Sequence, residues 1–352
     1  MPEKELWMGN QAFAEAAVRA GLDCYFGYPI TPQSEAPAYL SARLPEAGGV
    51  FLQAESELAA INMVFGAAAA GKRVMTSSSS PGISLKQEGI SYLAGAQLPA
   101  VIINIMRAGP GLGGITPSQA DYFQAVKGGG HGDYNCIVLA PSSVQEMADF
   151  TGEAFGLADK YRNPVLVVGD GILGQMIEPI EMKERYSPET YDKSSWALTG
   201  KKGREQHIVQ SLFLSEVLIG HNKVLQEKFA RIKREVVKFK EYYTDRFSVL
   251  VIAFGTMARC ALSAVRKCRE EGIDVGLFVP QTLWPFPSDR VSELVDRSQS
   301  VLVAEMNAGQ MIEDVCLAVQ KPFAYDTFNK IGGDIPRPGE VVKKIHDMVK
   351  EL

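Results

Sequence analysis

The first half of the chain alternates short apolar runs with longer segments of helical periodicity. The runs are apolar throughout, which is typical of parallel strands covered by helices on both faces. Predicted strands are Cys24–Gly27, Val50–Ala54, Val74–Ser77, Ala100–Met106, Cys136–Ala140 and Val165–Val168. Predicted helices are Gln11–Ala20, Glu57–Ala70, Ser84–Ala96 and Ser143–Asp159. The pattern predicts an α/β domain over about residues 1–178.

Three further details of this half bear on its helices. Thr31-Pro32 and Thr116-Pro117 each favour a helix start, with threonine as the N-cap and proline in the first turn. The predicted helix Glu57–Ala70 is apolar nearly all round, so we expect it to be buried on every face.

The second half changes character twice. Residues 179–247 are polar and end in the basic amphipathic stretch Lys223–Lys240, which predicts a linker with one long surface helix. Residues 248–352 predict a second, smaller α/β domain without an obvious catalytic constellation. Its predicted strands are Ser248–Ala253, Val275–Val279 and Ser300–Ala304.

Composition and charge exclude several classes of protein. Of the 352 residues, 46% are hydrophobic and 22% are charged, as in soluble globular proteins. The net charge of -5 argues against a nucleic-acid or membrane-surface binder. The sequence shows no secretory signal, and its longest apolar stretch, Leu58–Ala70, is too short to span a bilayer. We therefore expect a cytoplasmic protein.

The cysteines predict neither an iron–sulfur cluster nor another metal site. The chain has five, none in a Cys-x-x-Cys pair and none near a histidine at metal-ligand spacing. Scattered buried thiols fit a reducing compartment.

Two glycine-rich matches do not predict nucleotide sites. In Gly66–Lys72 the next residue is Arg73, where a phosphate loop needs Ser or Thr, and the order of helix and strand is reversed. Gly109–Gly114 contains G-x-G-x-x-G, but the helix is expected only from Thr116, and Pro110 removes a backbone donor.

The informative segments follow the predicted strands, where open parallel sheets bind their ligands. They are Gly27–Pro32, Gln53–Glu57, Thr76–Gly82 and Met106–Gly111. In this order they resemble the pyrimidine-binding domain of 2-oxoacid:ferredoxin oxidoreductases, and the string Tyr-Pro-Ile-Thr-Pro at 28–32 is the most specific part. Phe278–Pro287 resembles the transketolase-C-terminal-like domain of the same family.

The resemblance implies a reaction and leaves alternatives. Gly109–Ser118, Gln119-Ala120-Asp121 and the loop Gly128–Gly132 look most like the branched-chain (3-methyl-2-oxobutanoate) type. That type decarboxylates its 2-oxoacid oxidatively with thiamine diphosphate and coenzyme A, and passes electrons to ferredoxin. The alternatives are the 2-oxoglutarate type, a transketolase or 2-oxoacid dehydrogenase component, and an assembly subunit without catalysis.

The resemblance also assigns site residues. Glu57 would hydrogen-bond the pyrimidine ring and activate the cofactor; Glu55 is the competing candidate. Thr31 would bind a substrate oxygen, unless it is only a helix cap, and Arg107 would clamp the substrate carboxylate, unless it is a surface ion-pair partner. Tyr28, Pro29, Ser80, Pro81 and Gly82 would line the cofactor pocket. His131 is either a coenzyme A or substrate contact or an ordinary loop residue.

The sequence departs from the magnesium-binding motif of thiamine enzymes, and we therefore expect partner subunits. Gly169-Asp170-Gly171 begins like the magnesium motif of such enzymes, but no asparagine follows between Ser194 and Gly203, so we interpret it as a turn. A beta-type subunit would then hold the diphosphate and Mg²⁺. A gamma-type subunit and a ferredoxin-like iron–sulfur subunit would complete the complex, which is expected to be a dimer of heteromers.

Overall fold

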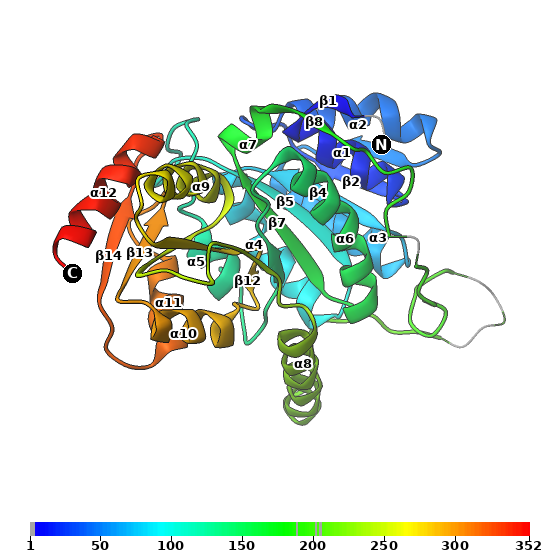
Figure 1. The fold of residues 1–352 in the computed structure, drawn as a ribbon. Coiled ribbons are helices and arrows are strands. Elements are labelled where there is room, and N and C mark those ends of the chain that lie inside the picture. Colours follow the sequence, from blue (N-terminus) through cyan, green and yellow to red (C-terminus); the bar gives the residue numbers. More distant parts are fainter. Residues whose placement is uncertain (1–3, 188, 201–202, 204–205) are drawn as a thin grey trace.

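The larger of two α/β units is built on a seven-stranded sheet (Figure 1). The computed structural model describes residues 4–187, 189–200, 203 and 206–352. The strand order is β12-β6-β7-β5-β4-β2-β3, and every neighbouring pair is parallel except β12 with β6. The strands are β2 Cys24–Gly27, β3 Val50–Gln53, β4 Val74–Ser78, β5 Ala100–Met106, β6 Ile137–Leu139, β7 Pro164–Asp170 and β12 Thr282–Trp284.

Helices cover both faces of this sheet because its strands alternate two sets of buried side chains. Val74 and Ile102 join the apolar cluster formed with α3 and α4, whereas Met75 and Val101 join the one formed with α1, α2 and α6. The helices of this unit are α1 Gly9–Arg19, α2 Glu35–Glu46, α3 Glu57–Ala69, α4 Ser80–Gly95, α5 Tyr122–Lys127, α6 Val144–Tyr161 and α7 Gly171–Gln175. A separate antiparallel ribbon pairs β1 Glu5–Met8 with β8 Ile177–Ile180.

The smaller unit has a five-stranded sheet in the order β14-β13-β10-β11-β9, with β9 antiparallel to β11. Its strands are β9 Phe239–Tyr242, β10 Val249–Ala253, β11 Val275–Pro280, β13 Ser300–Glu305 and β14 Tyr325–Asn329. Its helices are α9 Gly255–Glu270, α10 Ser288–Arg297, α11 Met311–Val319 and α12 Pro338–Lys350. One apolar cluster continues from this sheet into the larger unit, where the rings of Tyr122 and Phe254 lie 5.7 Å apart. The two units therefore share a core.

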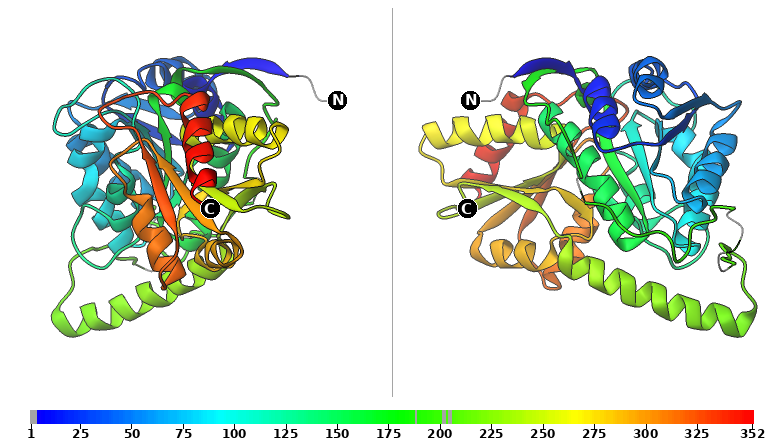
Figure 2. Two further views of the ribbon diagram at one scale, coloured as in Figure 1. Left: turned by 60° about the vertical axis from the view of Figure 1, so that its left-hand side comes forward. Right: turned by 90° about the vertical axis from the view of Figure 1, so that its right-hand side faces the viewer.

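Helix α8, Ser215–Glu235, runs along one end of the molecule, away from α9 and α12 (Figure 2). Its second half is anchored by the buried side chains of Leu225, Phe229 and Ile232. Its first half exposes Leu218 and its neighbours. No helix in the described part of the chain is long and apolar enough to cross a membrane.

The α/β prediction is confirmed, and most predicted strands lie within a residue or two of their observed bounds. The amphipathic stretch Lys223–Lys240 was predicted to be helical throughout, but the helix ends at Glu235 and residues 239–242 form β9. The linker therefore supplies a strand to the smaller sheet, and β12 from the C-terminal part extends the larger one.

Three helix predictions were wrong. Helix α2 begins only at Glu35, with Ser34 as its N-cap residue, so Thr31 caps no helix. Pro117 lies opposite Arg107 in an isolated β-bridge, and α5 begins only at Tyr122. Helix α3 is not buried on every face, because the side chains of Leu58 and Met63 are 47% and 37% exposed.

Candidate active site

Glu57 is a buried acid at the first position of α3. The preceding residue, Ser56, is the N-cap, and its hydroxyl accepts a hydrogen bond from the Ala59 amide at 3.1 Å. This cap starts the helix so that Glu57 is only 6% exposed. In the described part of the chain, no hydrogen bond or ion pair holds the Glu57 carboxyl. A buried carboxyl without partners is free to bind a ligand.

Gly82 makes room for this carboxyl in the first turn of α4. A methyl group placed on Gly82 would lie 2.6 Å from Glu57 Oε1 and 2.1 Å from Ser78 Oγ. The Ser78 hydroxyl is buried beside it without a partner among the described residues. The hydroxyl of Ser79, the N-cap residue of α4, is also buried and unpartnered among them. The ends of α3, β4 and α4 thus form a small polar cradle. Glu55, the competing acid, is exposed and accepts a hydrogen bond from Ser56, so the geometry favours Glu57.

Ser80 ties the start of α4 to the end of β5. Its hydroxyl donates to Asp121 Oδ2 at 2.6 Å and accepts from the Arg107 amide at 2.9 Å. Asn104 completes the cluster by donating to the same carboxylate oxygen at 2.8 Å. Burial raises the pKa of Asp121, although the hydrogen bonds from Ser80 and Asn104 act in the opposite direction. Asn104 and the role of Asp121 were missed from the sequence, although Asp121 was part of the subtype pattern.

Arg107 and Thr31 come together, but in a different way from the one predicted. The Arg107 guanidinium donates to the backbone carbonyls of Thr31 and Leu112, both at 2.9 Å, and its Nε has no partner among the described residues. Arg107 is 8% exposed, so it is not a surface ion-pair partner. The Thr31 side chain is exposed at the same edge of the sheet.

A pocket of about 620 Å³ opens beside Ser80, Pro81 and Arg107, between the two units. The smaller unit contributes Asn307, Gln310 and Ile331 among its lining residues. Glu57 and Thr31 do not line this pocket. The loop containing His131 is exposed and lies elsewhere, with the Gly129 amide bound to Gln87 Oε1 at 3.1 Å.

The remaining predicted pocket residues lie at the same edge of the sheet. Tyr28 is half-buried and Pro29 is exposed in the loop that follows β2. Because β2 pairs in parallel with β3 and β4, this loop lies next to the ends of both strands.

Asp170 in the Gly-Asp-Gly segment caps a helix. Its Oδ1 accepts hydrogen bonds from the Ile172 and Leu173 amides at 3.0 and 3.2 Å, at the N-terminus of α7. The segment is therefore a strand-to-helix turn, as predicted. The described residues contain no group of three or more His, Cys, Asp or Glu side chains that could hold a metal ion, and all five cysteines are free.

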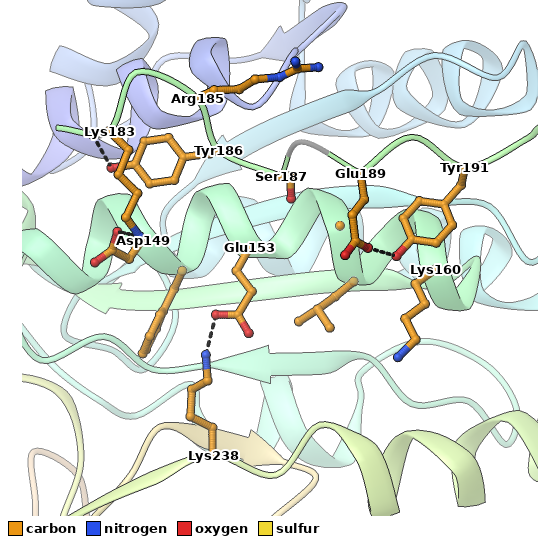
Figure 3. Close-up of a pocket in the computed structure, with 13 residues that line it drawn as sticks. Asp149, Glu153, Lys160, Lys183, Arg185, Tyr186, Ser187, Glu189, Tyr191 and Lys238 are labelled. Carbon is orange, nitrogen blue, oxygen red and sulfur yellow. Dashed lines mark hydrogen bonds and ion pairs between the residues drawn. The ribbon is translucent and has the colours of Figure 1, made fainter.

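A second pocket, of about 590 Å³, lies over α6 on the opposite face of the larger sheet (Figure 3). Lys238 is paired there with Glu153, and Lys183 with Asp149. The Glu189 carboxylate accepts a hydrogen bond from Tyr191. This second pocket contains none of the predicted site residues, and its charged lining residues are of both signs, with two of its lysines paired to its acids.

Comparison with known proteins identifies the family. Residues 15–238 match the family model described as "Pyruvate flavodoxin/ferredoxin oxidoreductase, thiamine diP-bdg", and residues 248–341 match "Pyruvate:ferredoxin oxidoreductase core domain II". The chain belongs to the 2-oxoacid:ferredoxin oxidoreductases. Within this family it is an alpha-type subunit with a thiamine-diphosphate-binding domain, and the resemblance inferred from the sequence is confirmed.

Three relatives give the degree of similarity. The ketoisovalerate oxidoreductase subunit VorB of Methanothermobacter thermautotrophicus is 53% identical over 341 residues, which cover 97% of this chain and 96% of the relative. The 2-oxoglutarate synthase subunit KorA of Archaeoglobus fulgidus is 40% identical, with 89% of this chain and 91% of the relative covered. The structure of 2-oxoglutarate:ferredoxin oxidoreductase from Magnetococcus marinus, with 2-oxoglutarate, coenzyme A and succinyl-CoA bound, is 25% identical with a TM-score of 0.89. The match covers 98% of this chain but only 65% of the Magnetococcus chain.

The relatives are named as subunits, which indicates that this 2-oxoacid:ferredoxin oxidoreductase chain is one component of a multi-subunit enzyme. Its residues fit the pyrimidine half of thiamine diphosphate. The uncommitted Glu57 carboxyl, the space left by Gly82 and the unpartnered Ser78 hydroxyl together form a polar cradle that can bind a ring with donors and acceptors.

Proposed function

We propose that this subunit activates thiamine diphosphate in a complex that converts 3-methyl-2-oxobutanoate and coenzyme A to a branched acyl-CoA. The reaction releases CO₂ and one proton and passes two electrons to ferredoxin. The observation that carries the catalytic role is the buried, unpartnered carboxyl of Glu57 beside Gly82. The substrate rests on the 53% identity with the ketoisovalerate oxidoreductase subunit.

Each predicted residue then has a defined task. Thiamine diphosphate, when bound, stores the electron pair that remains after decarboxylation. Glu57 holds and moves a proton at its carboxyl oxygen, towards the pyrimidine edge. The Thr31 hydroxyl donates to the keto or carboxylate oxygen of the substrate. Arg107 exchanges its two backbone carbonyls for the substrate carboxylate, which the planar guanidinium binds through two parallel hydrogen bonds.

The pocket beside Arg107 supports a small branched substrate. Arg107 and the Ser80–Asp121 pair are among its polar groups on the larger unit, together with Ser84 and Ser118. Pro81 and Pro110 of the larger unit and Ile331 of the smaller one add apolar surface. Such a lining suits an acid whose other end is a short hydrocarbon. Tyr28 and Pro29, with Ser80–Gly82, are assigned to the walls of the cofactor site.

The outer faces of α3 and α4 support docking of the subunit that holds the diphosphate and Mg²⁺. Leu58 and Met63 on α3, the helix that begins with Glu57, and Leu85 and Tyr92 on the neighbouring α4 are exposed. Apolar side chains gathered beside a cofactor cradle are typical of a protein interface. A gamma-type subunit and a ferredoxin-like iron–sulfur subunit complete the proposed complex, which we assign as a dimer of heteromers.

A second candidate substrate is 2-oxoglutarate. The Archaeoglobus subunit named 2-oxoglutarate synthase is 40% identical, and the matching Magnetococcus enzyme was solved with 2-oxoglutarate and coenzyme A. A second carboxylate in the substrate would require another cation in the pocket, and Arg107 is the only Lys or Arg among its described lining residues. This observation favours the branched acid.

The test is coenzyme-A-dependent reduction of a viologen dye by the complex purified with its natural partners. Rates with 3-methyl-2-oxobutanoate, 2-oxoglutarate and pyruvate are compared with and without thiamine diphosphate. A thiamine-dependent preference for the branched acid is expected. A preference for 2-oxoglutarate would overturn the substrate assignment, and no thiamine-dependent rate with any of the three would overturn the reaction.

The matched variants Glu57→Gln and Glu55→Gln test the catalytic assignment. Both remove one charge from the same turn, but only Glu57 is buried in the cradle. We expect Glu57→Gln to lose at least about 100-fold in rate, as for loss of a positioned proton-transfer group, and Glu55→Gln to keep the normal rate. An assembled Glu57→Gln complex with normal turnover would overturn the catalytic assignment of Glu57.

A further inference from the structure

Lys86 is a fully buried lysine in the helix next to Glu57. It lies on the inner face of α4 and is 0% exposed. Its Nζ donates to Thr76 Oγ1 at 2.8 Å and to the Ser77 carbonyl at 3.2 Å, both on β4. Lysine is almost never fully buried without an ion pair, because its ammonium group loses its hydration. The described residues provide no carboxylate within ion-pair distance of Lys86.

Packing between the helices fixes the amine in this place. α3 and α4 are so close that a methyl group on Gly89 would lie 2.6 Å from Ile61. Ile83 and Ile90, one turn before and after Lys86 on α4, belong to the same apolar cluster as Ile61. The lysine stem therefore fills apolar space, and only its amine reaches the polar end of β4.

Among the charged side chains on α3, β4 and α4, Glu57 is the one that can act on Lys86. α3 carries no other charged residue, and β4 carries none. On α4 itself Glu88 is exposed on the outer face, and Asp121, which precedes α5, is bound to Ser80 and Asn104. Burial lowers the pKa of Lys86 to about 7, and the negative charge of Glu57 acts in the opposite direction.

We propose that Lys86 is the counter-charge of the Glu57 carboxylate and a positioning residue for cofactor activation, an inference that rests on the proposed function. When Glu57 passes its proton to the pyrimidine edge, the carboxylate that remains lies in a site with little water. A protonated Lys86 stabilises that anion through its positive charge. The negative charge of Glu57 in turn acts to raise the pKa of the buried amine, against the larger effect of burial.

This role has a characteristic pH dependence. Below about pH 7 the amine is protonated and favours the Glu57 carboxylate; above about pH 8 it is largely neutral and contributes little. Removing the amine is therefore expected to lower kcat/KM in acidic solution and to leave it unchanged in mildly alkaline solution. A purely structural role would reduce activity by the same factor at every pH.

The test compares Lys86→Met with wild type in the assembled complex. Methionine has a similar length and keeps the apolar packing without the charge. Thr76→Val is the second variant: it retains Lys86 but removes its hydroxyl acceptor, so a smaller change in the same direction is expected. Ser91→Ala, at a buried polar position further along α4, is the control for altered packing.

Two measurements are made across pH. The first is kcat/KM for the 2-oxoacid. Its acidic limb is expected to move up by about one pH unit in Lys86→Met, which is about a tenfold loss in acid, with convergence on wild type above about pH 8. The second is the circular dichroism of bound thiamine diphosphate, which distinguishes the amino and imino forms of its pyrimidine. The midpoint between these forms is expected to move in the same direction.

Superimposable pH profiles for Lys86→Met and wild type, or a uniform loss at every pH, would overturn the inference. Glu57→Gln measured in parallel separates this failure from failure of the proposed function. An inactive Glu57→Gln complex with unchanged Lys86→Met profiles rejects only the role of Lys86. A fully active Glu57→Gln complex rejects the role of Glu57 and with it that of Lys86.

Discussion

Gly82 matters because it has no side chain. It is buried in the first turn of α4, between Ser78 Oγ and Glu57 Oε1, where even a methyl group would overlap both atoms. Polar groups from β4 and α3 can approach each other only while this position is a glycine. The dependence of the cradle on one small residue can be tested directly.

We expect Gly82→Ala to displace the Glu57 carboxyl and to lower kcat/KM by about 100-fold, the effect of roughly 1 Å of misplacement in an active site. The control is Gly66→Ala in α3, where no atom lies within 4 Å of the added methyl group. That variant is expected to keep its activity and to gain about 0.5 kcal/mol in the free energy of unfolding. Equal activities in a rate assay of the two complexes would contradict this account of Gly82.

Sequence reasoning located the candidate residues but not their contacts. Glu57, Ser80 and Arg107 each follow a predicted parallel strand, and such strands share one edge, so their grouping was predictable. The hydrogen bonds from Arg107 to the carbonyls of Thr31 and Leu112 could not be predicted, because they depend on the conformation of the loops. The burial of Lys86 could have been predicted from the sequence, because this residue lies between Ile83 and Ile90 on the apolar stripe of α4.

At the scale of elements, the strands that the sequence failed to predict pair with distant segments. β9, from the linker, pairs with β11 of the smaller unit, and β12, from the C-terminal part of the chain, pairs with β6 of the larger unit. β14 is an edge strand with half-buried or exposed side chains, so its pattern lacks an apolar run. Central strands such as β5 are apolar throughout and were found, because burial on both faces determines their composition.

Helix α8 is expected to depend on a few anchors. Phe229 is 1% exposed, and Phe229→Ala should lower the free energy of unfolding by about 3 kcal/mol through lost burial and the cavity that remains. Val217→Ala, on the exposed half of the same helix, should change it by less than about 0.5 kcal/mol. Denaturant titration of the two variants checks the difference, and similar losses would mean that the first half is also packed.

At the scale of the whole molecule, one buried phenol joins the two units. Tyr122 donates to Asp314 Oδ2 at 2.7 Å, and burial, followed by the charge of Asp314, raises its pKa well above the ordinary value. Tyr122→Phe removes this bond and should cost about 2 kcal/mol, since the acceptor is charged. Tyr92→Phe, which removes an exposed bond to Glu88, is the control and should be nearly neutral in the same denaturation experiment.

Two lysines, the buried Lys86 and the half-buried Lys228, should make the free energy of unfolding depend on pH. Burial lowers the pKa of Lys86 and of Lys228 to about 7, so between about pH 7 and 10 the unfolded chain binds protons that the folded chain does not. The free energy of unfolding should therefore rise with pH through this window. Relative to Lys86→Met, wild type should gain up to about 1.4 kcal/mol per pH unit from pH 7 to 9. Parallel stability curves for the two proteins would show that Lys86 titrates normally.

The exchange of strands between the two sheets constrains how a gene for this protein can be divided. A break after residue 247 would leave β9 on the first polypeptide and its partner β11 on the second. The same break would place β12 on the second polypeptide, away from its partner β6 on the first. Each half would expose an unpaired sheet edge until it met the other. Fission or module swapping at this point therefore requires co-expression of both halves, whereas a graft that moves 239–352 without the larger unit would carry β12 without its sheet.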